Sequence, residues 1–189
     1  FKVLASAQNL EKATETWEEV LDYCDPYPPK EKDVASMPLV PALQKLSRKP
    51  ARGTVRKQIR TRWGALYAIA SIAGTGSGRG GSNARVFMDE LREHRNWDSW
   101  NAIKNTKNAI WNSQIWTASN AGDRRAIVLK ELRDQMVEAV DEYEKYVESG
   151  LWDLERWANK HDATSAIFEW SAMPGVQKSD PDGILQANP

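Results

Sequence analysis

The stretch Ala84-Arg85-Val86-Phe87-Met88-Asp89-Glu90 decides the fold of this chain, because an apolar run ends there in two adjacent carboxylates. Its three apolar residues are too few for a helix of their own, and several glycines come just before them. A short apolar run bounded by turn signals predicts a strand that is buried on both faces, as in a parallel sheet. The two carboxylates would then lie at the carboxyl end of the strand, where open α/β sheets bind their ligands.

The acidic pair Asp89 and Glu90 has the pattern of a Walker B element. In that element the Asp holds Mg²⁺, usually through water, and the Glu polarises the water that attacks the γ-phosphate of ATP. A strand that simply runs into a solvated turn often ends in the same two residue types. The pair by itself leaves both interpretations open.

Length and composition indicate a single α/β domain. The chain has 189 residues, of which 41% are hydrophobic, and this is enough for a sizeable core. Cys24 is the only cysteine, which excludes an internal disulfide and a cysteine-rich zinc site and favours a reducing compartment. We find no apolar run long enough to span a membrane and no signal peptide. The start at Phe1 without Met indicates a fragment of a longer protein.

Charge is unevenly distributed, although the net charge is zero. The segment from Val34 to Met88 has ten basic and no acidic residues, whereas Asp123 to Asp162 has an acidic excess. Such asymmetry makes a polyanion or an acidic neighbouring subunit a reasonable partner for the middle of the chain. Two oppositely charged solvated surfaces explain the pattern equally well.

Periodicity predicts strands that alternate with helices, and therefore a mostly parallel sheet. Helical spacing is clearest after the cap residue Asn9 and before the terminating Gly150, and Trp63-Gly64 predicts the turn of a hairpin. We interpret Trp17 and Trp116 as packing residues. The expected strands are 1–7, 54–62, 65–73, 84–88, 114–117 and 166–170, and the expected helices are 9–24, 42–46, 97–110, 128–147 and 152–159.

The glycine-rich loop from Gly74 to Ser82 is not a phosphate-binding P-loop, because it contains no Lys and leads into a strand. At the rim of a sheet it would present Arg79, which can act as an arginine finger on a neighbouring subunit's γ-phosphate. A flexible loop with a solvated Arg is the simpler alternative.

The polar cluster Thr117, Ala118, Ser119 and Asn120 follows the next predicted strand. In ATPases built on this sheet plan, such a cluster lies beside the γ-phosphate and reports hydrolysis to the rest of the domain. An ordinary helix cap before Arg124 is an equally good explanation.

Several motifs occur in a fixed order along the chain. They are Leu4-Ala5-Ser6-Ala7-Gln8 leading to Trp17, a Gly-Arg-Gly-Gly-Ser loop, Val-Phe-Met-Asp-Glu, Gln-Ile-Trp-Thr-Ala-Ser-Asn-Ala-Gly, and Phe168-Glu169-Trp170-Ser171-Ala172. This ordered set resembles the large terminase subunit of tailed bacteriophages, the motor that pumps double-stranded DNA into a procapsid. The resemblance extends over the whole chain, and its order is more specific than any single motif.

The resemblance implies an α/β fold, namely a three-layer P-loop-NTPase-like domain with a mostly parallel central sheet and flanking helices. It implies that Asp89 is the Mg²⁺ carboxylate, Glu90 the catalytic glutamate, Thr117 to Asn120 the coupling motif and Arg79 a trans-acting finger. ATP would be the substrate and Mg²⁺ the cofactor. The implied partners are double-stranded DNA, the portal protein, the small terminase subunit and further copies in a homo-oligomeric ring, without a membrane, in the host bacterial cytoplasm.

The chain departs from the family in three places. The Walker A unit normally precedes the strand that begins here at Phe1, the nuclease domain normally follows, and Leu91 stands where a small residue is usual. We therefore expect a partial ATPase domain at 1–173, a linker at 174–189, and no activity of the fragment alone. The alternatives are another nucleic-acid-dependent P-loop ATPase such as a helicase, or a non-catalytic DNA- or partner-binding module that uses the basic segment 45–62.

Overall fold

The structure is a computed structural model, and it divides the chain into two compact units, Phe1–Lys130 and Glu131–Pro189. The expected boundary between 173 and 174 stays a prediction. The structure describes residues 1–7, 9–30, 33–53, 57–71, 82–150, 154–162, 164–173, 175–177 and 179–187. Within these residues, no helix is both long and apolar enough to cross a membrane.

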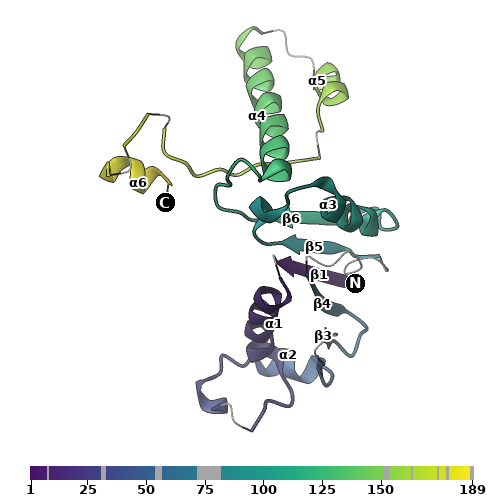
Figure 1. The fold of residues 1–189 in the computed structure, drawn as a ribbon. Coiled ribbons are helices and arrows are strands. Elements are labelled where there is room, and N and C mark those ends of the chain that lie inside the picture. Colours follow the sequence, from purple (N-terminus) through teal and green to yellow (C-terminus); the bar gives the residue numbers. More distant parts are fainter. Residues whose placement is uncertain are drawn as a thin grey trace. The chain divides into compact units, whose positions relative to one another are not determined.

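The first unit contains a mixed, mostly parallel sheet, as the sequence predicts (Figure 1). Its strands are β1 (Lys2–Ala7), β2 (Ala51–Arg52), β3 (Lys57–Arg60), β4 (Leu66–Ser71), β5 (Arg85–Met88) and β6 (Gln114–Thr117). They follow the order β2-β3-β4-β1-β5-β6. The pairs β4/β1, β1/β5 and β5/β6 are parallel, whereas β2/β3 and β3/β4 are antiparallel. The α/β prediction and the hairpin are confirmed, and Gly64 in the hairpin turn has a φ of +83°.

One face of the sheet is covered by α1 (Leu10–Cys24). Asn9 begins this helix, because its side-chain oxygen accepts a hydrogen bond of 2.9 Å from the backbone N–H of Lys12. Trp17 and Leu21 then pack with Ile59 of β3 in a buried cluster. The predicted cap, helix and core position of Trp17 are confirmed.

The opposite face is covered by α3 (Trp97–Lys104). Ile103 of this helix packs in one buried cluster with Leu4 of β1, Ala70 of β4, and Val86 and Met88 of β5. The short elements around it are η1 (Val34–Ser36), α2 (Pro41–Leu46), η2 (Leu91–Glu93) and η3 (Asn105–Lys107). Helices therefore flank both sides of the central strands.

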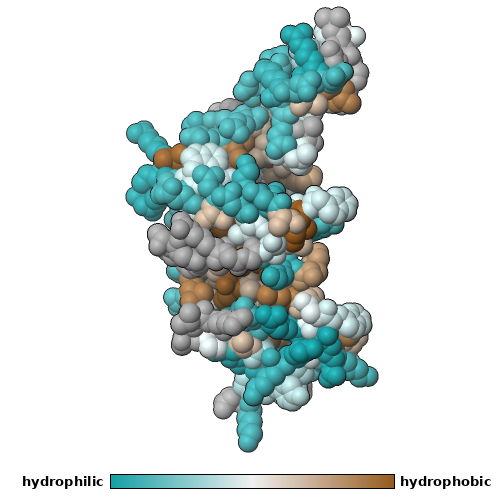
Figure 2. Space-filling model, turned by 90° about the vertical axis from the view of Figure 1, so that its right-hand side faces the viewer, coloured by the Kyte–Doolittle hydropathy of each residue, from teal (hydrophilic) through white to brown (hydrophobic). Residues whose placement is uncertain are grey.

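Two predictions about burial are wrong. Phe87 and Trp116 are 45% and 52% exposed, so β5 is buried on one face only and Trp116 is not a core residue. The reason is that the two side chains are register partners on the α1 side of the sheet, where α1 packs on β4, β1 and β3. Exposed apolar side chains are also visible among hydrophilic ones in the space-filling view (Figure 2).

The second unit contains most of α4 (Ile127–Glu148), together with α5 (Leu154–Lys160) and α6 (Pro181–Ala187). The helix α5 is tied to α4 by a hydrogen bond of 2.9 Å from Trp157 Nε1 to the carbonyl of Ala139. His161 and Lys160 both pair with the Glu142 carboxylate, and these contacts hold the pKa of that carboxyl below its usual value. The predicted helix end is confirmed, since Gly150 has a φ of +65°.

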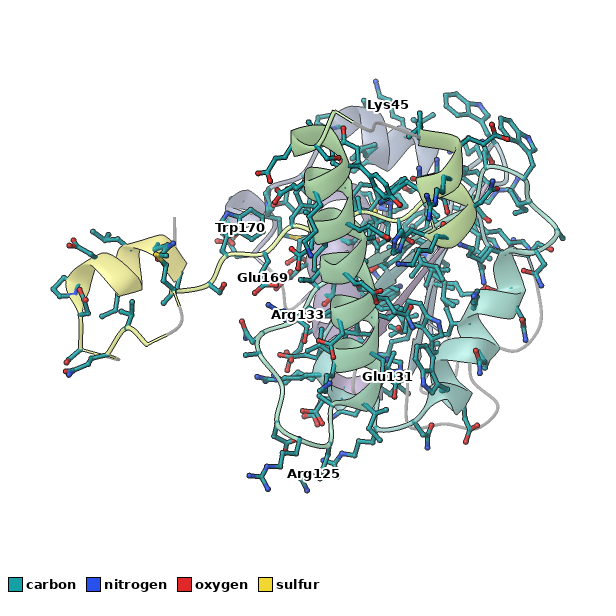
Figure 3. All side chains as sticks on the ribbon, turned by 90° about the horizontal axis from the view of Figure 1, so that it is seen from above. Lys45, Arg125, Glu131, Arg133, Glu169 and Trp170 are labelled. Carbon is teal, nitrogen blue, oxygen red and sulfur yellow. The ribbon has the colours of Figure 1, made fainter. Side chains whose placement is uncertain are left out.

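The prediction of a strand at 166–170 is wrong. These residues form no helix or strand, and Phe168 and Trp170 are 76% and 63% exposed. Glu169 between them binds Arg133 through two hydrogen bonds of 2.7 and 2.9 Å, a contact that Figure 3 displays. A strand requires a neighbouring strand for its backbone hydrogen bonds, and sequence alternation alone does not supply one. The region expected as a linker also contains α6.

We predict that the two faces of β5 respond differently to the same polar substitution. Met88→Gln should lower the free energy of unfolding by about 3 kcal/mol, because an amide would be buried where the side chain is 1% exposed. Phe87→Gln should cost about 1 kcal/mol or less. Denaturant unfolding of both variants measures the difference, and equal losses would mean that the α1 side of β5 is covered in solution.

Candidate functional site

The residues that follow β5 and β6 meet at one edge of the sheet, because parallel strands end on the same side. The backbone N–H of Asp89 donates to the carbonyl of Ser6 at 3.0 Å, and the N–H of Ala118 donates to the carbonyl of Met88 at 2.9 Å. A carbonyl of β1 thus positions the first residue after β5, and a carbonyl of β5 positions the first residue after β6. The acidic pair and the predicted coupling cluster are therefore adjacent.

Two further hydrogen bonds join the turn after β5 to the cluster after β6. The N–H of Leu91 donates to the carbonyl of Ala118 at 3.2 Å, and the N–H of Arg92 donates to Ser119 Oγ at 3.0 Å. Ser119 Oγ in turn donates to the carbonyl of Asn120 at 2.8 Å. Ser119 thus connects the two strand ends.

Asp89 is exposed at the end of β5. One carboxylate oxygen, Oδ1, accepts the N–H of Glu90 at 2.9 Å, which orients the side chain. Among the described residues, no three His, Cys, Asp or Glu side chains gather as a metal-ligand set. A single exposed carboxylate suits Mg²⁺, which keeps several waters and takes its remaining ligands from bound phosphate.

Glu90 adopts a left-handed backbone conformation, with φ 57° and ψ 51°. It is the only non-glycine residue with a positive φ in the described part of the chain. This conformation turns the chain sharply from β5 into η2, and for a residue with a Cβ it costs about 1 to 2 kcal/mol. Strain of this kind is characteristic of functional sites, where the surrounding structure imposes it.

The Glu90 side chain is engaged by Arg92, a residue that the sequence analysis did not single out. Oε2 of Glu90 lies 2.7 Å from Arg92 Nε, and the two side chains are 31% and 36% exposed. The pair lacks the angle of a hydrogen bond, and Oε2 has no hydrogen-bond partner among the described residues. Oε2 of the carboxylate therefore faces Arg92.

The loop behind the cluster is tightly packed. A Cβ on Gly122 would lie 2.3 Å from Cβ of Ala126 and 3.2 Å from Cβ of Arg92. Gly122 is the last residue of the Gln-Ile-Trp-Thr-Ala-Ser-Asn-Ala-Gly motif, and the sequence analysis did not foresee this steric restriction. Arg79, the predicted finger, lies outside the described residues, so its role stays a prediction. Thr117 ends β6, and its side chain is exposed.

His94 follows η2 and is 1% exposed. Its carbonyl accepts the N–H of Val128 at the start of α4 at 3.4 Å, while neither ring nitrogen has a hydrogen-bond partner among the described residues. Burial lowers the pKa of His94 below its ordinary value. The imidazole is therefore neutral at pH 7.

Replacing Glu90 by Gly should make the chain more stable than replacing it by Ala. Both variants remove the ion pair with Arg92, but only Gly adopts the positive φ without steric cost. We expect the Gly variant to be more stable by about 1 kcal/mol in denaturant unfolding. An Ala variant of equal or greater stability would show that Glu90 is not strained.

Acidification should lower the free energy of unfolding because His94 is buried. The pKa of His94 is lowered in the folded state, so the unfolded chain binds a proton at this residue first as the pH falls. The free energy of unfolding should be highest above about pH 6.5 and should decrease below it, toward the folded pKa. Urea unfolding at several pH values measures this loss. His94→Leu should remove that component, and an unchanged pH dependence in the variant would contradict the assignment.

Comparison with known proteins leaves the family of this chain unassigned. No protein-family model, no curated protein and no solved structure matches it. The functional interpretation therefore depends on the geometry at the strand ends and on the motifs in the sequence.

Proposed function

We propose that this chain is part of a viral DNA-packaging motor, the packaging ATPase of a large terminase subunit. The complete protein would hydrolyse ATP with Mg²⁺ to move double-stranded DNA into a procapsid. One observation supports this most: Asp89 and Glu90 leave β5 directly beside Ala118 and Ser119, which leave the neighbouring parallel strand β6. An acidic pair at the carboxyl end of a parallel strand suits metal-assisted nucleotide hydrolysis, and the polar cluster at the adjacent strand end could contact the nucleotide.

In this proposal the two carboxylates have different tasks. Asp89, exposed and oriented through the N–H of Glu90, would hold Mg²⁺. Glu90 orients and polarises the attacking water once it separates from Arg92. Mg²⁺, when bound, would supply charge stabilisation to the transferring phosphoryl group, and Arg79 of a neighbouring copy would add to it. No covalent intermediate is needed.

The hydrogen bonds around Ser119 supply a route for coupling. Glu90 is two residues from Arg92, whose N–H binds Ser119 Oγ. When Glu90 exchanges Arg92 for a water at the γ-phosphate, the turn after β5 changes its contacts. That change reaches the cluster after β6 directly, because the two strand ends share these hydrogen bonds.

A phosphate-binding loop is required in addition, and the sheet has a place for the unit that carries it. Among the described strands β6 is the last in the order, so none of them pairs with its outer edge. Phe87 and Trp116 leave apolar area beside it on the α1 side, although parallel sheets are normally covered on both faces. A strand and helix that bring the Walker A loop would complete both features.

The remaining parts of the proposal come from the resemblance alone. They are the portal protein and the small terminase subunit as partners, a homo-oligomeric ring during packaging, and the host bacterial cytoplasm as the location. Another nucleic-acid-dependent P-loop ATPase, such as a helicase, is the main rival. ATP-driven packaging of a duplex into procapsids, without strand separation, distinguishes the two.

Substitution of the candidate catalytic glutamate tests the proposal. In the complete protein, Glu90→Gln should reduce DNA-stimulated phosphate release by about 100-fold or more and leave nucleotide binding intact, because the amide cannot act as a base. Glu93→Gln, three residues further along the chain, is the matched control and should retain hydrolysis. Equal rates for the wild type and Glu90→Gln would remove the acidic pair from the chemistry.

A further inference from the structure

We propose that a basic patch at the far end of the sheet holds the phosphate backbone of double-stranded DNA. The basic patch consists of five exposed residues from α2, the segment after it and the β3 hairpin: Lys45, Arg48, Lys49, Arg60 and Arg62. The inference rests on the proposed function, because it assigns the surface that contacts the DNA in that motor.

Antiparallel pairing brings these cations together. Ser47 and Thr61 form a bridge, the N–H of Arg48 donates to the carbonyl of Arg60 at 2.8 Å, and the N–H of Arg62 donates to the carbonyl of Leu46 at 2.7 Å. Arg48 therefore lies directly opposite Arg60. Directly opposed like charges destabilise a sheet, so a structural role alone would not favour this pairing.

Among the described residues, no acidic side chain neutralises the basic patch. None of its five residues forms an ion pair or side-chain hydrogen bond with another described residue. Two nearby cations, in contrast, have partners within the chain. Arg52 pairs with Asp25, and Lys57 lies over the Trp17 ring at 5.3 Å. Lys45 points outward from α2 (Figure 3). The positive charge that remains is available to an external anion.

The chemistry of the basic patch favours a nucleic acid over a protein. Protein interfaces have an apolar core and are depleted in Lys, whereas phosphate contacts are made mainly by Arg and Lys. Trp63, beside Arg62, is 81% exposed, but it is one aromatic side chain, and single-strand binders use several in succession. A duplex, recognised through its backbone, fits these side chains best.

The basic patch lies away from the candidate catalytic site within the sheet. Arg60 pairs with Leu66 at the start of β4, and Leu66 pairs with Lys2 at the start of β1. Asp89 lies beyond the opposite end of these strands, next to Ser6. Substitution of the basic patch should therefore change DNA binding without altering the hydrolytic residues.

The first test measures the binding of the chain to a fluorescent duplex of about 30 base pairs at several salt concentrations from about 50 to about 200 mM. We expect Arg48→Gln/Arg60→Gln to weaken binding by at least about tenfold at 0.1 M salt and to reduce the slope of log K against log salt by about 2. Lys104→Gln/Lys107→Gln removes the same charge elsewhere and should leave both quantities near the wild-type values.

Folding is checked separately. Arg60→Gln relieves the repulsion with Arg48, so its melting temperature should equal or exceed that of the wild type while its DNA affinity falls. Two results would overturn the proposal. One is equal DNA binding by the wild type and the Arg48→Gln/Arg60→Gln variant. The other is displacement of the duplex by single-stranded DNA or a polyglutamate peptide at equal charge concentration.

The two proposals can fail independently. In the complete protein, variants of the basic patch should lose DNA stimulation and retain basal ATP hydrolysis, whereas Glu90→Gln should lose hydrolysis and retain DNA binding. Salt-dependent duplex binding through the basic patch combined with Glu90-independent hydrolysis would remove the motor and leave a DNA-binding module. Glu90-dependent hydrolysis with wild-type binding in the Arg48→Gln/Arg60→Gln variant would remove the basic patch and leave the motor.

Discussion

The parallel pairing of β5 between β1 and β6 is the constraint on which the rest of the first unit depends. It places Val86 and Met88 against α3 and sends Phe87 to the other face. Because all three strands end at the same edge, it also brings Asp89 next to Ala118. The core and the candidate site therefore both depend on one strand register. A shift of β5 by one residue would turn Val86 and Met88 away from α3 and would separate Asp89 from Ala118.

At the end of β5, stability and chemistry have opposing requirements. The left-handed conformation of Glu90 costs stability, and a glycine would meet the same turn without strain. Arg92 offsets part of the cost by pairing with the carboxylate, although an ion pair whose side chains are about one third exposed contributes only about 0 to 1 kcal/mol. The proposed function would explain a strained Glu in this position by its need for the carboxylate itself.

The surface of the first unit has two energetically unfavourable features. One is the apolar area at Phe87 and Trp116, beside the edge of β6 that no described strand pairs with. The other is the basic patch, in which Arg48 and Arg60 oppose each other. Both are unfavourable for a fold considered alone. They have a common explanation if this sheet works as part of a larger machine that covers one surface and holds a polyanion on the other.

The sequence by itself determined the features with local causes. Asn9 caps α1 through its own side chain, Gly64 and Gly150 adopt the positive φ that other residues avoid, and the 3.6-residue period marks α1 and α4. Tertiary structure decided the exposure of Trp116, the pairing of Glu90 with Arg92 and the missing partner of 166–170. These outcomes depend on which segments meet across the sheet and on how far one helix extends over it, and residue spacing along the chain contains neither.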